Sequence, residues 1–285
     1  MEIKKVGVLG FTGTMGRGIV QIAAQAGYQV VASSRNEERS AKGVSSIDST
    51  LGRAVERGRL TQEDKDAAMS RITGTTDIND FKDCDLVIEV AVEDLEIKKA
   101  TFAELDKICP KDAILATNTS VLPVIEIAGV TAKPEKVIGL HFFNPPPVMK
   151  LVEIIRTTAT SDDTLETARK FAESLDKTCV VVPDTAGFIV NRLAVPFMLN
   201  AIHLLEDGVA SAEDIDTAIT LGLNHPMGPL ALADLIGNDI VQAMAEGIYV
   251  VLKEDRFIVP ELLKKMVAEG KLGRKSGHGF YDYSK

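Results

Sequence analysis

The sequence predicts an α/β fold with a doubly wound, mostly parallel sheet, followed by a second, all-α C-terminal domain. Two observations predict it. Short apolar runs alternate with helical patterns up to residue 183, and beyond it the pattern is helical almost to the end. A strand, a glycine-rich turn and a helix open the chain, in the order of a Rossmann-type βαβ unit. We therefore expect a dinucleotide-binding domain at 1–183 and a helical domain for substrate binding and dimerisation at 184–285.

Composition narrows the class of protein. The chain has 285 residues, of which 45% are hydrophobic and 26% charged, as in ordinary globular proteins of two domains. No apolar run reaches the roughly 20 residues of a membrane span, and the N-terminus lacks a signal-peptide layout, so we expect a cytoplasmic protein without a membrane partner. The net charge of −9 argues against nucleic acid as a partner. Three cysteines without a CxxC pair predict buried thiols rather than disulfides.

The glycine turn follows an apolar strand at Lys4–Leu9 and precedes helical spacing at Arg17–Ala26. Glycines let the backbone approach a pyrophosphate, and the helix N-terminus offers free N–H groups. The candidate contacts to the cofactor here are Gly10, Gly13, Thr14, Met15 and Gly16. The usual spacing is GxGxxG, whereas this chain has GxxGxxG with one extra residue before Gly13. The extra residue predicts a bulged turn and altered phosphate contacts.

The second strand, Gln29–Ser33, leads into Ser34 and Arg35. An acidic residue at this point would bind the ribose 2′-hydroxyl and repel a 2′-phosphate. A neutral hydroxyl followed by a guanidinium suits a phosphate instead. The cofactor is therefore expected to be NADP or NAD, with NADP favoured. The alternative is that Arg35 is a solvated loop charge and that both cofactors are used.

The segment 36–73 is predicted to be helical, and it carries a local basic face in an acidic protein. The face consists of Arg53, Arg57 and Arg59. One interpretation is a solvated helix face. The other is a clamp for the polyphosphate group of a substrate.

Polar residues gather where the next strands end. Asp85–Ala91 reads as a buried strand, and Glu93–Lys98 opens the following helix with acidic residues that suit its dipole. Ile114–Ala116 is another buried strand, followed by Thr117-Asn118-Thr119-Ser120. Open α/β sheets bind ligands at the carboxyl ends of their strands, so Ser120 is a candidate site residue.

The segment 137–155 contains the predicted chemistry. Val137–Phe143 reads as a buried strand that Asn144 and the prolines at 145–147 terminate, and Val148–Ile155 resumes the apolar pattern. A reversal at the prolines would place His141 beside Glu153, at the same edge as Ser120. Imidazole carries protons near neutral pH and a carboxylate orients it, so this pair is a candidate acid/base dyad. The alternative is an ordinary core histidine.

The remainder of the chain is predicted as one helix, one strand and then a helical domain. The helix is Thr164–Asp176, the strand is Cys179–Val182, and a break follows at 183–187. The later helices are predicted at Phe188–Leu205, interrupted by Pro196, and at Ala212–Leu221, Leu230–Leu252 and Glu261–Glu269. The first of these is too apolar to face water on most sides, which predicts a homodimer.

Taken together, these segments resemble the 3-hydroxyacyl-CoA dehydrogenase family, most closely its bacterial 3-hydroxybutyryl-CoA dehydrogenases. The resemblance covers essentially the whole chain. It is carried by the motifs DLVIE, VEDLEIK, TNTS, GLHFFNP, MKLVE, GFIVNR, EDIDTA, HPMGP and GRKSGHGFYDY. The lengthened glycine turn and the Ser34-Arg35 ending depart from the pattern of NAD-using members.

The resemblance implies an enzyme that moves a hydride between a nicotinamide cofactor and a short-chain 3-hydroxyacyl-CoA or 3-oxoacyl-CoA, without a metal. It implies that His141 is the catalytic histidine and Glu153 its partner, while Ser120 and Asn191 bind the reacting oxygen. The residues implied to contact the cofactor are Glu93, Lys98, Asn144 and Lys275. The helix with Arg53 and Arg57 is implied to meet the coenzyme A group of the substrate.

Two other functions remain open at this point. One is a two-domain dehydrogenase of a free hydroxy acid, against which the HFFNP and LVE motifs and the basic face argue. The other is a non-catalytic dinucleotide-binding protein, which would not need His141, Glu153, Ser120 and Asn191 together.

Overall fold

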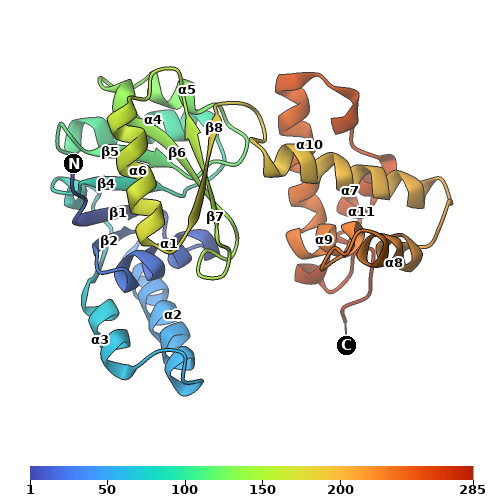
Figure 1. Ribbon diagram of the computed structural model, residues 1–285, viewed down its shortest axis with the longest axis horizontal. Coiled ribbons are helices and arrows are strands. Elements are labelled where there is room, and N and C mark those ends of the chain that lie inside the picture. The colour runs from blue at the N-terminus through green and yellow to red at the C-terminus, as the bar shows by residue number, and fades with distance from the viewer. Residues whose placement is uncertain (285) are drawn as a thin grey trace. The chain divides into compact units, whose positions relative to one another are not determined.

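The structure is a computed structural model that describes residues 1–284. The chain divides into two compact units, Met1–Asp184 and the part from Thr185 onward (Figure 1).

An eight-stranded sheet forms the centre of the N-terminal unit. Its strands are β1 (Lys5–Leu9), β2 (Gln29–Ser33), β3 (Ile72–Thr75), β4 (Leu86–Glu89), β5 (Ile114–Thr117), β6 (Val137–Phe142), β7 (Leu151–Arg156) and β8 (Thr178–Pro183). Their order is β3-β2-β1-β4-β5-β6-β7-β8. Neighbours pair in parallel except β6 and β7, which are antiparallel. The predicted fold class, a mostly parallel Rossmann-type sheet, is confirmed.

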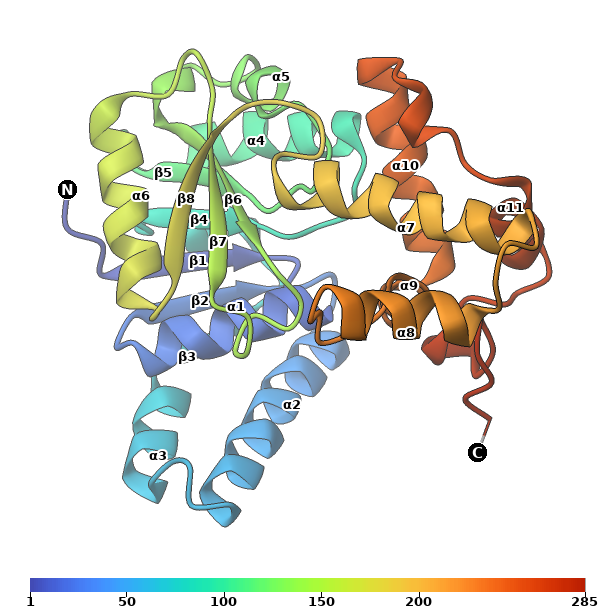
Figure 2. The same ribbon diagram turned by 45° about the vertical axis from the view of Figure 1, so that its right-hand side comes forward.

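Helices cover both faces of this sheet. They are α1 (Thr14–Gln25), α2 (Glu37–Glu56), α3 (Gln62–Ser70), α4 (Leu95–Ile108), α5 (Val124–Ala128) and α6 (Asp162–Ser174), with short 3-10 turns η1 (Ile78–Phe81) and η2 (Pro134–Lys136). In Figure 2, α1 and α6 lie on one face, and α4 and α5 lie on the other. The α1–α6 face buries an apolar cluster in which Ile19 and Phe171 pack against Val8 and Ile154 of the sheet. Strands buried on both faces read as continuous apolar runs, which is why the sequence shows them clearly.

The prediction of helix over the whole of 36–73 was wrong at its end. Asn36 caps α2 by accepting a hydrogen bond from the Arg39 N–H, and Thr61 caps α3 in the same way. The chain then leaves the helix at Arg71, and Ile72–Thr75 pairs with β2 as the edge strand β3. The β-branched residues of this segment favour the strand.

The unit from Thr185 onward is helical. Its elements are α7 (Val190–Glu206), α8 (Ala212–Gly222), α9 (Pro229–Ile236), α10 (Asn238–Leu252), η3 (Asp255–Phe257), α11 (Glu261–Ala268) and η4 (Arg274–Ser276). The predicted interruption at Pro196 was wrong, because α7 runs through this buried proline. The predicted single helix Leu230–Leu252 was also wrong. Gly237 takes φ +109° between α9 and α10, whose axes differ in direction by 96°. This conformation favours glycine and ends a helix.

Two buried aspartates tie the glycine-rich tail to this helical unit. Asp234 accepts hydrogen bonds from the backbone N–H groups of Phe280 and Tyr281, both at 3.0 Å. Asp216 accepts the Tyr281 hydroxyl at 2.8 Å and also caps α9. A Cβ atom on Gly279 would lie 1.9 Å from an Asp234 carboxylate oxygen, so this position needs glycine. The hydrogen bond from Tyr281 to Asp216 therefore joins the motif GRKSGHGFYDY to the motif EDIDTA.

Within residues 1–284, no single helix combines the length and the apolar composition that crossing a membrane requires. The bent pair α9 and α10 passes that test only when its two helices are counted together.

Candidate active site

The sheet itself pairs His141 with Glu153. The two residues are directly opposite in the antiparallel register of β6 and β7. Opposite side chains in such a pair lie on the same face of the sheet, so the ring and the carboxylate meet. His141 Nδ1 is 2.8 Å from Glu153 Oε2, and the two residues are only 5% and 1% exposed. The predicted reversal of the chain at the prolines is confirmed.

Ser120 lies at the other ring nitrogen. Its Oγ is 3.2 Å from His141 Nε2. The serine follows β5, which neighbours β6 in the sheet, so both side chains reach the same edge as the sequence predicts. With Nδ1 bonded to a carboxylate, Nε2 is the nitrogen that can exchange a proton with a bound oxygen. Three side chains from three neighbouring segments thus form a serine–histidine–glutamate chain.

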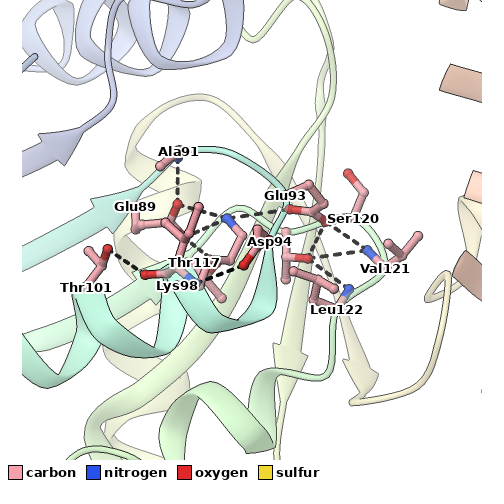
Figure 3. Close-up of polar contacts among 12 residues, drawn as sticks. Glu89, Ala91, Glu93, Asp94, Lys98, Thr101, Thr117, Ser120, Val121 and Leu122 are labelled. Carbon is pink, nitrogen blue, oxygen red and sulfur yellow. Dashed lines mark hydrogen bonds and ion pairs between the residues drawn. The ribbon is translucent and has the colours of Figure 1, made fainter. Parts of the chain in front are cut away.

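Glu93 holds the segment that carries Ser120. Its Oε1 accepts hydrogen bonds from the Ser120 N–H at 2.8 Å, from the Val121 N–H at 3.3 Å and from the Thr119 hydroxyl at 2.5 Å. Figure 3 shows this carboxylate between the Ser120 segment and Lys98. Glu93 therefore fixes the backbone on which the serine is placed.

Lys98 is buried behind Glu93. Its ammonium is 2.8 Å from each carboxylate oxygen of Glu89 and 3.5 Å from Glu93 Oε2. Thr117 also donates to Glu89, at 2.8 Å. Lys98 is 1% exposed and Glu89 is fully buried. The family resemblance implies that Lys98 contacts the cofactor, and Lys98 would do so from this interior position behind Glu93 (Figure 3).

Asn144 begins an exposed proline loop between β6 and β7 that is anchored from two sides. The buried Lys177 ammonium donates to the carbonyl oxygens of Pro146 at 2.6 Å and Met149 at 2.9 Å. Burial lowers the pKa of Lys177 from its usual value. On the other side, a Cβ on Gly18 would lie 2.7 Å from Pro146 Cδ, so the loop packs directly on α1. Asn144 is therefore presented from a fixed loop.

The glycine turn fits a dinucleotide. Gly10 takes φ +88°, and a Cβ there would lie 2.9 Å from the Val90 carbonyl oxygen. A Cβ on Gly16 would lie 2.5 Å from Phe11 Cα, whereas a Cβ on Gly13 would meet nothing within 4 Å. Gly13 is also the N-cap of α1 and offers no capping side chain, so the N–H groups of Thr14, Met15 and Gly16 are left for another acceptor. The glycine turn thus provides an open cradle at a helix N-terminus.

Phe11 is the first residue of the turn after Gly10. Its side chain is fully buried, and a Cβ on Gly43 of α2 would lie 2.5 Å from its ring. The backbone N–H groups of Gly10 and Phe11 both donate to the Ser33 carbonyl, at 3.0 and 3.3 Å. Phe11 therefore ties the glycine turn to α2 and to the end of β2.

At the end of β2, the Ser34 hydroxyl donates to the Asn36 carbonyl at 2.9 Å, and Arg35 is exposed. Arg53 and Arg57 are exposed at the C-terminal end of α2, where Arg57 is the C-cap. Arg35 at the end of β2, and the pair Arg53 and Arg57 on α2, are therefore all accessible to an anionic ligand.

Asn191 and Lys275 belong to the helical unit. Asn191 is the second residue of α7 and is half-buried. Lys275 lies on η4 and pairs with Asp239 at 2.7 Å. The tail that carries Lys275 is the one held by Asp234.

Sequence reasoning missed three residues of this edge: Glu89, Thr117 as a partner of Glu89, and Lys177. An acidic residue at the end of an otherwise apolar strand, nine residues before a lysine, was a signal for Glu89. Lys177 gave no such signal, because its partners are backbone carbonyls.

Comparisons with known proteins place both parts of the chain in one family. Residues 5–185 match the family model described as 3-hydroxyacyl-CoA dehydrogenase, NAD binding domain. Residues 187–283 match the model described as 3-hydroxyacyl-CoA dehydrogenase, C-terminal domain.

The chain is similar over its length to 3-hydroxybutyryl-CoA dehydrogenases. It is 46% identical to one from Clostridioides difficile, over 99% of this chain and 100% of the relative. It is 44% identical to one from Mycobacterium tuberculosis, over 99% of each chain. The crystal structure of (S)-3-hydroxybutyryl-CoA dehydrogenase from Ralstonia eutropha matches with a TM-score of 0.96 and 42% identity, covering 100% of both chains.

Proposed function

This chain belongs to the 3-hydroxyacyl-CoA dehydrogenase family, and we propose that it interconverts acetoacetyl-CoA and 3-hydroxybutyryl-CoA with a nicotinamide cofactor. The observation that carries the proposal is the chain of contacts from the half-buried Ser120 to the buried His141 and Glu153, at the ligand-binding edge of a Rossmann-type sheet. The relatives named above support the choice of substrate. We assign cofactor binding to residues 1–183, and we assign dimerisation and a part of substrate binding, through Asn191, to residues 184–285.

His141 moves the proton of the reaction. A bound nicotinamide cofactor supplies or takes the hydride at C3 of the substrate. In the reducing direction, the protonated ring gives its Nε2 proton to the oxygen that forms on C3. In the oxidising direction, neutral Nε2 takes that proton back from the hydroxyl group.

Glu153 and Ser120 prepare the ring and the oxygen. The carboxylate at Nδ1 holds the ring in one tautomer and stabilises the imidazolium form. The Ser120 hydroxyl lies next to Nε2, where it donates to the substrate oxygen as negative charge develops there. Asn191 is assigned the second hydrogen bond to this oxygen.

The cofactor would be held at its phosphates by Gly10, Gly13, Thr14, Met15 and Gly16. The further residues assigned to it are Glu93, Lys98, Asn144 and Lys275, and Lys98 would act from behind Glu93. The open space at Gly13 supports this assignment. NADP is the favoured cofactor, because Ser34 and the exposed Arg35 replace the acidic residue that would repel a 2′-phosphate.

The coenzyme A group is assigned to Arg53 and Arg57. Both side chains are exposed on α2, and the chain as a whole carries a net charge of −9. A local pair of guanidinium groups supplies the positive charge that the phosphates of the substrate need.

Initial rates with two cofactors and two substrates test the proposal. We expect oxidation of NADPH with acetoacetyl-CoA to exceed oxidation of NADH, and we expect free acetoacetate to be reduced far more slowly. Substitution His141→Gln should lower kcat by roughly 10²- to 10⁴-fold without loss of the fold. Near-normal turnover of a folded His141→Gln variant would remove the assignment of this residue, and equal rates with free acetoacetate would favour a hydroxy-acid dehydrogenase.

A further inference from the structure

Two deeply buried charges of the N-terminal unit lie beside the site. Glu89 is 0% and Lys98 is 1% exposed, and the lysine contacts both carboxylate oxygens at 2.8 Å. Taking two charges out of water is costly, and a buried ion pair adds little net stability compared with apolar residues of the same volume. A pair in this position therefore points to a role in placing other groups.

Every neighbour of the Glu89 carboxylate is a hydrogen-bond donor. Oε1 accepts from the Ala91 N–H at 2.6 Å and from Lys98, while Oε2 accepts from the Thr117 hydroxyl at 2.8 Å and from Lys98. Only an ionised carboxylate offers acceptors to all four donors. The site is thus built for a negative charge that three segments share: β4, α4 and β5.

Lys98 links the buried Glu89 carboxylate to the partly exposed Glu93 carboxylate. An ammonium has three N–H donors, and Lys98 has three carboxylate oxygens around it: two from Glu89 and one from Glu93, at 3.5 Å. Among Glu89, Lys98 and Glu93, the Glu93 side chain lies nearest the surface, with 38% of it exposed. Its other oxygen accepts from the Ser120 N–H and the Thr119 hydroxyl.

We propose that Glu89 is a positioning residue, which acts through Lys98 and Glu93 to hold Ser120 against His141. The inference rests on the proposed function, because the position of Ser120 affects turnover only if its hydroxyl meets the reacting oxygen. The chain of contacts runs from Glu89 to Lys98, Glu93 and the Ser120 backbone (Figure 3). The Ser120 hydroxyl then contacts His141 Nε2. Lys98 serves in this chain as the link between two carboxylates.

Glu89→Gln tests the first link with Lys98 unchanged. The amide places an NH₂ group where a carboxylate oxygen faced two donors, so Lys98 moves and Glu93 loses its support. We expect kcat for acetoacetyl-CoA to fall roughly 10- to 100-fold, because small displacements of positioned groups have effects of this size. The KM for acetoacetyl-CoA should stay within about threefold.

The ¹⁵N resonances of the His141 ring provide the second measurement. Loss of the Ser120 hydroxyl from Nε2 should shift the Nε2 signal, while Nδ1 keeps its carboxylate partner. A purely structural role of Glu89 would lower the thermal midpoint but would leave this resonance in place.

A double variant guards against loss of the fold. Glu89→Met with Lys98→Met replaces both charges by apolar side chains, which buried ion pairs tolerate better than the loss of one partner. This variant should be folded and should show the same shift at His141 and a similar loss of kcat.

Asp85→Asn is the matched control for stability. Asp85 precedes the same strand, at its opposite end, and accepts from the backbone N–H groups of Lys4 and Lys5 at 2.7 and 2.9 Å. This variant should lower the thermal midpoint but keep kcat within about twofold and leave the His141 resonance unchanged.

Folded Glu89 variants with wild-type kcat and an unshifted His141 resonance would overturn the inference. So would a loss of kcat no larger than that of Asp85→Asn. If the wild-type protein does not reduce acetoacetyl-CoA, the proposed function fails, while the His141 resonance still reports whether Glu89 positions Ser120.

Discussion

The two ring nitrogens of His141 have different partners, and this division sets the direction in which a proton can move. Nδ1 contacts the Glu153 carboxylate, and Nε2 contacts the Ser120 hydroxyl. Nε2 is therefore the nitrogen on the side assigned to the substrate oxygen. The residue type was predictable from the sequence, and so was its partner, because a strand, a proline break and a second strand require the two to meet. The acidic residue at the end of β4 was a signal for Glu89, but its pairing with Lys98 was not predictable, since the pairing depends on which side of α4 the lysine faces.

Removal of the Glu153 charge tests the division of roles. Glu153→Gln keeps the size of the side chain but no longer stabilises the imidazolium form, so we expect kcat to fall roughly 10²- to 10⁴-fold. Steady-state rates with acetoacetyl-CoA measure this effect, and circular dichroism checks the fold. A folded variant with kcat within about threefold of wild type would contradict the role of the carboxylate.

The cysteines give a prediction for alkaline pH. Burial raises the pKa of Cys84 to about 12, of Cys109 to about 12 and of Cys179 to about 11, from an ordinary value of 9.0. The unfolded chain therefore releases these protons at lower pH than the folded chain does. The stabilisation from the thiols is complete below pH 9.0, decreases as the pH rises above 9.0, and is lost once the pH has passed 11 to 12.

Two measurements check the thiols. The native protein at about pH 8 should react slowly with a disulfide reagent, and all three thiols should react quickly once the chain is unfolded. The free energy of unfolding in urea should fall between about pH 9 and 10.5. Rapid reaction of Cys84 in the native state would show that it is not held as a buried thiol.

At the scale of elements, the glycine turn and α1 were predicted from their spacing, and so were most strands, because strands buried on both faces leave clear apolar runs. The errors occurred where local pattern and tertiary context differ. β3 is an edge strand of four residues, Gly237 breaks a run that is apolar on both sides, and Pro196 is accommodated inside α7. In each case a backbone or packing requirement overrides the residue pattern.

A pair of glycine substitutions separates cofactor binding from folding. In Gly13→Ala the new Cβ meets no protein atom within 4 Å and lies in the cradle assigned to the cofactor. We expect unchanged thermal stability and a dinucleotide Kd raised by about tenfold or more.

Gly18→Ala is the contrasting variant on the same helix. Its Cβ would lie 2.7 Å from Pro146, so overpacking should cost about 1–3 kcal/mol of unfolding free energy. Calorimetric titration with NADPH and thermal unfolding measure both variants. Equal loss of stability in the two would show that Gly13 is a packing position and not part of a cofactor site.

At the scale of the whole molecule, the apolar surface of α7 bears on assembly. One stripe of α7 is buried, with Val195, Met198 and Ile202. Another stripe remains accessible, where Leu193 is 65% and Leu204 is 44% exposed. The spacing of these two leucines places them on one face of the helix. A helix that is apolar on two faces supports the expected homodimer.

Light scattering tests the assembly. We expect the mass of a dimer for the wild type and a shift toward monomer for Leu193→Glu, because a charge on the accessible stripe opposes burial. Leu221→Glu is the matched control on α8, where the leucine is 80% exposed and lies off this stripe, and it should remain a dimer. A monomeric wild type at micromolar concentration would refute the assignment.

The register between β6 and β7 has a consequence for protein engineering. Both members of the acid–base pair come from a single hairpin of 20 residues, Val137–Arg156, and the backbone ladder alone brings them into contact. Such a hairpin could be transferred to another protein as one continuous segment. Grafted onto the edge of another sheet that supplies a serine on the adjoining strand, it would carry its proton chemistry with it, provided that the connecting loop keeps the β6–β7 register.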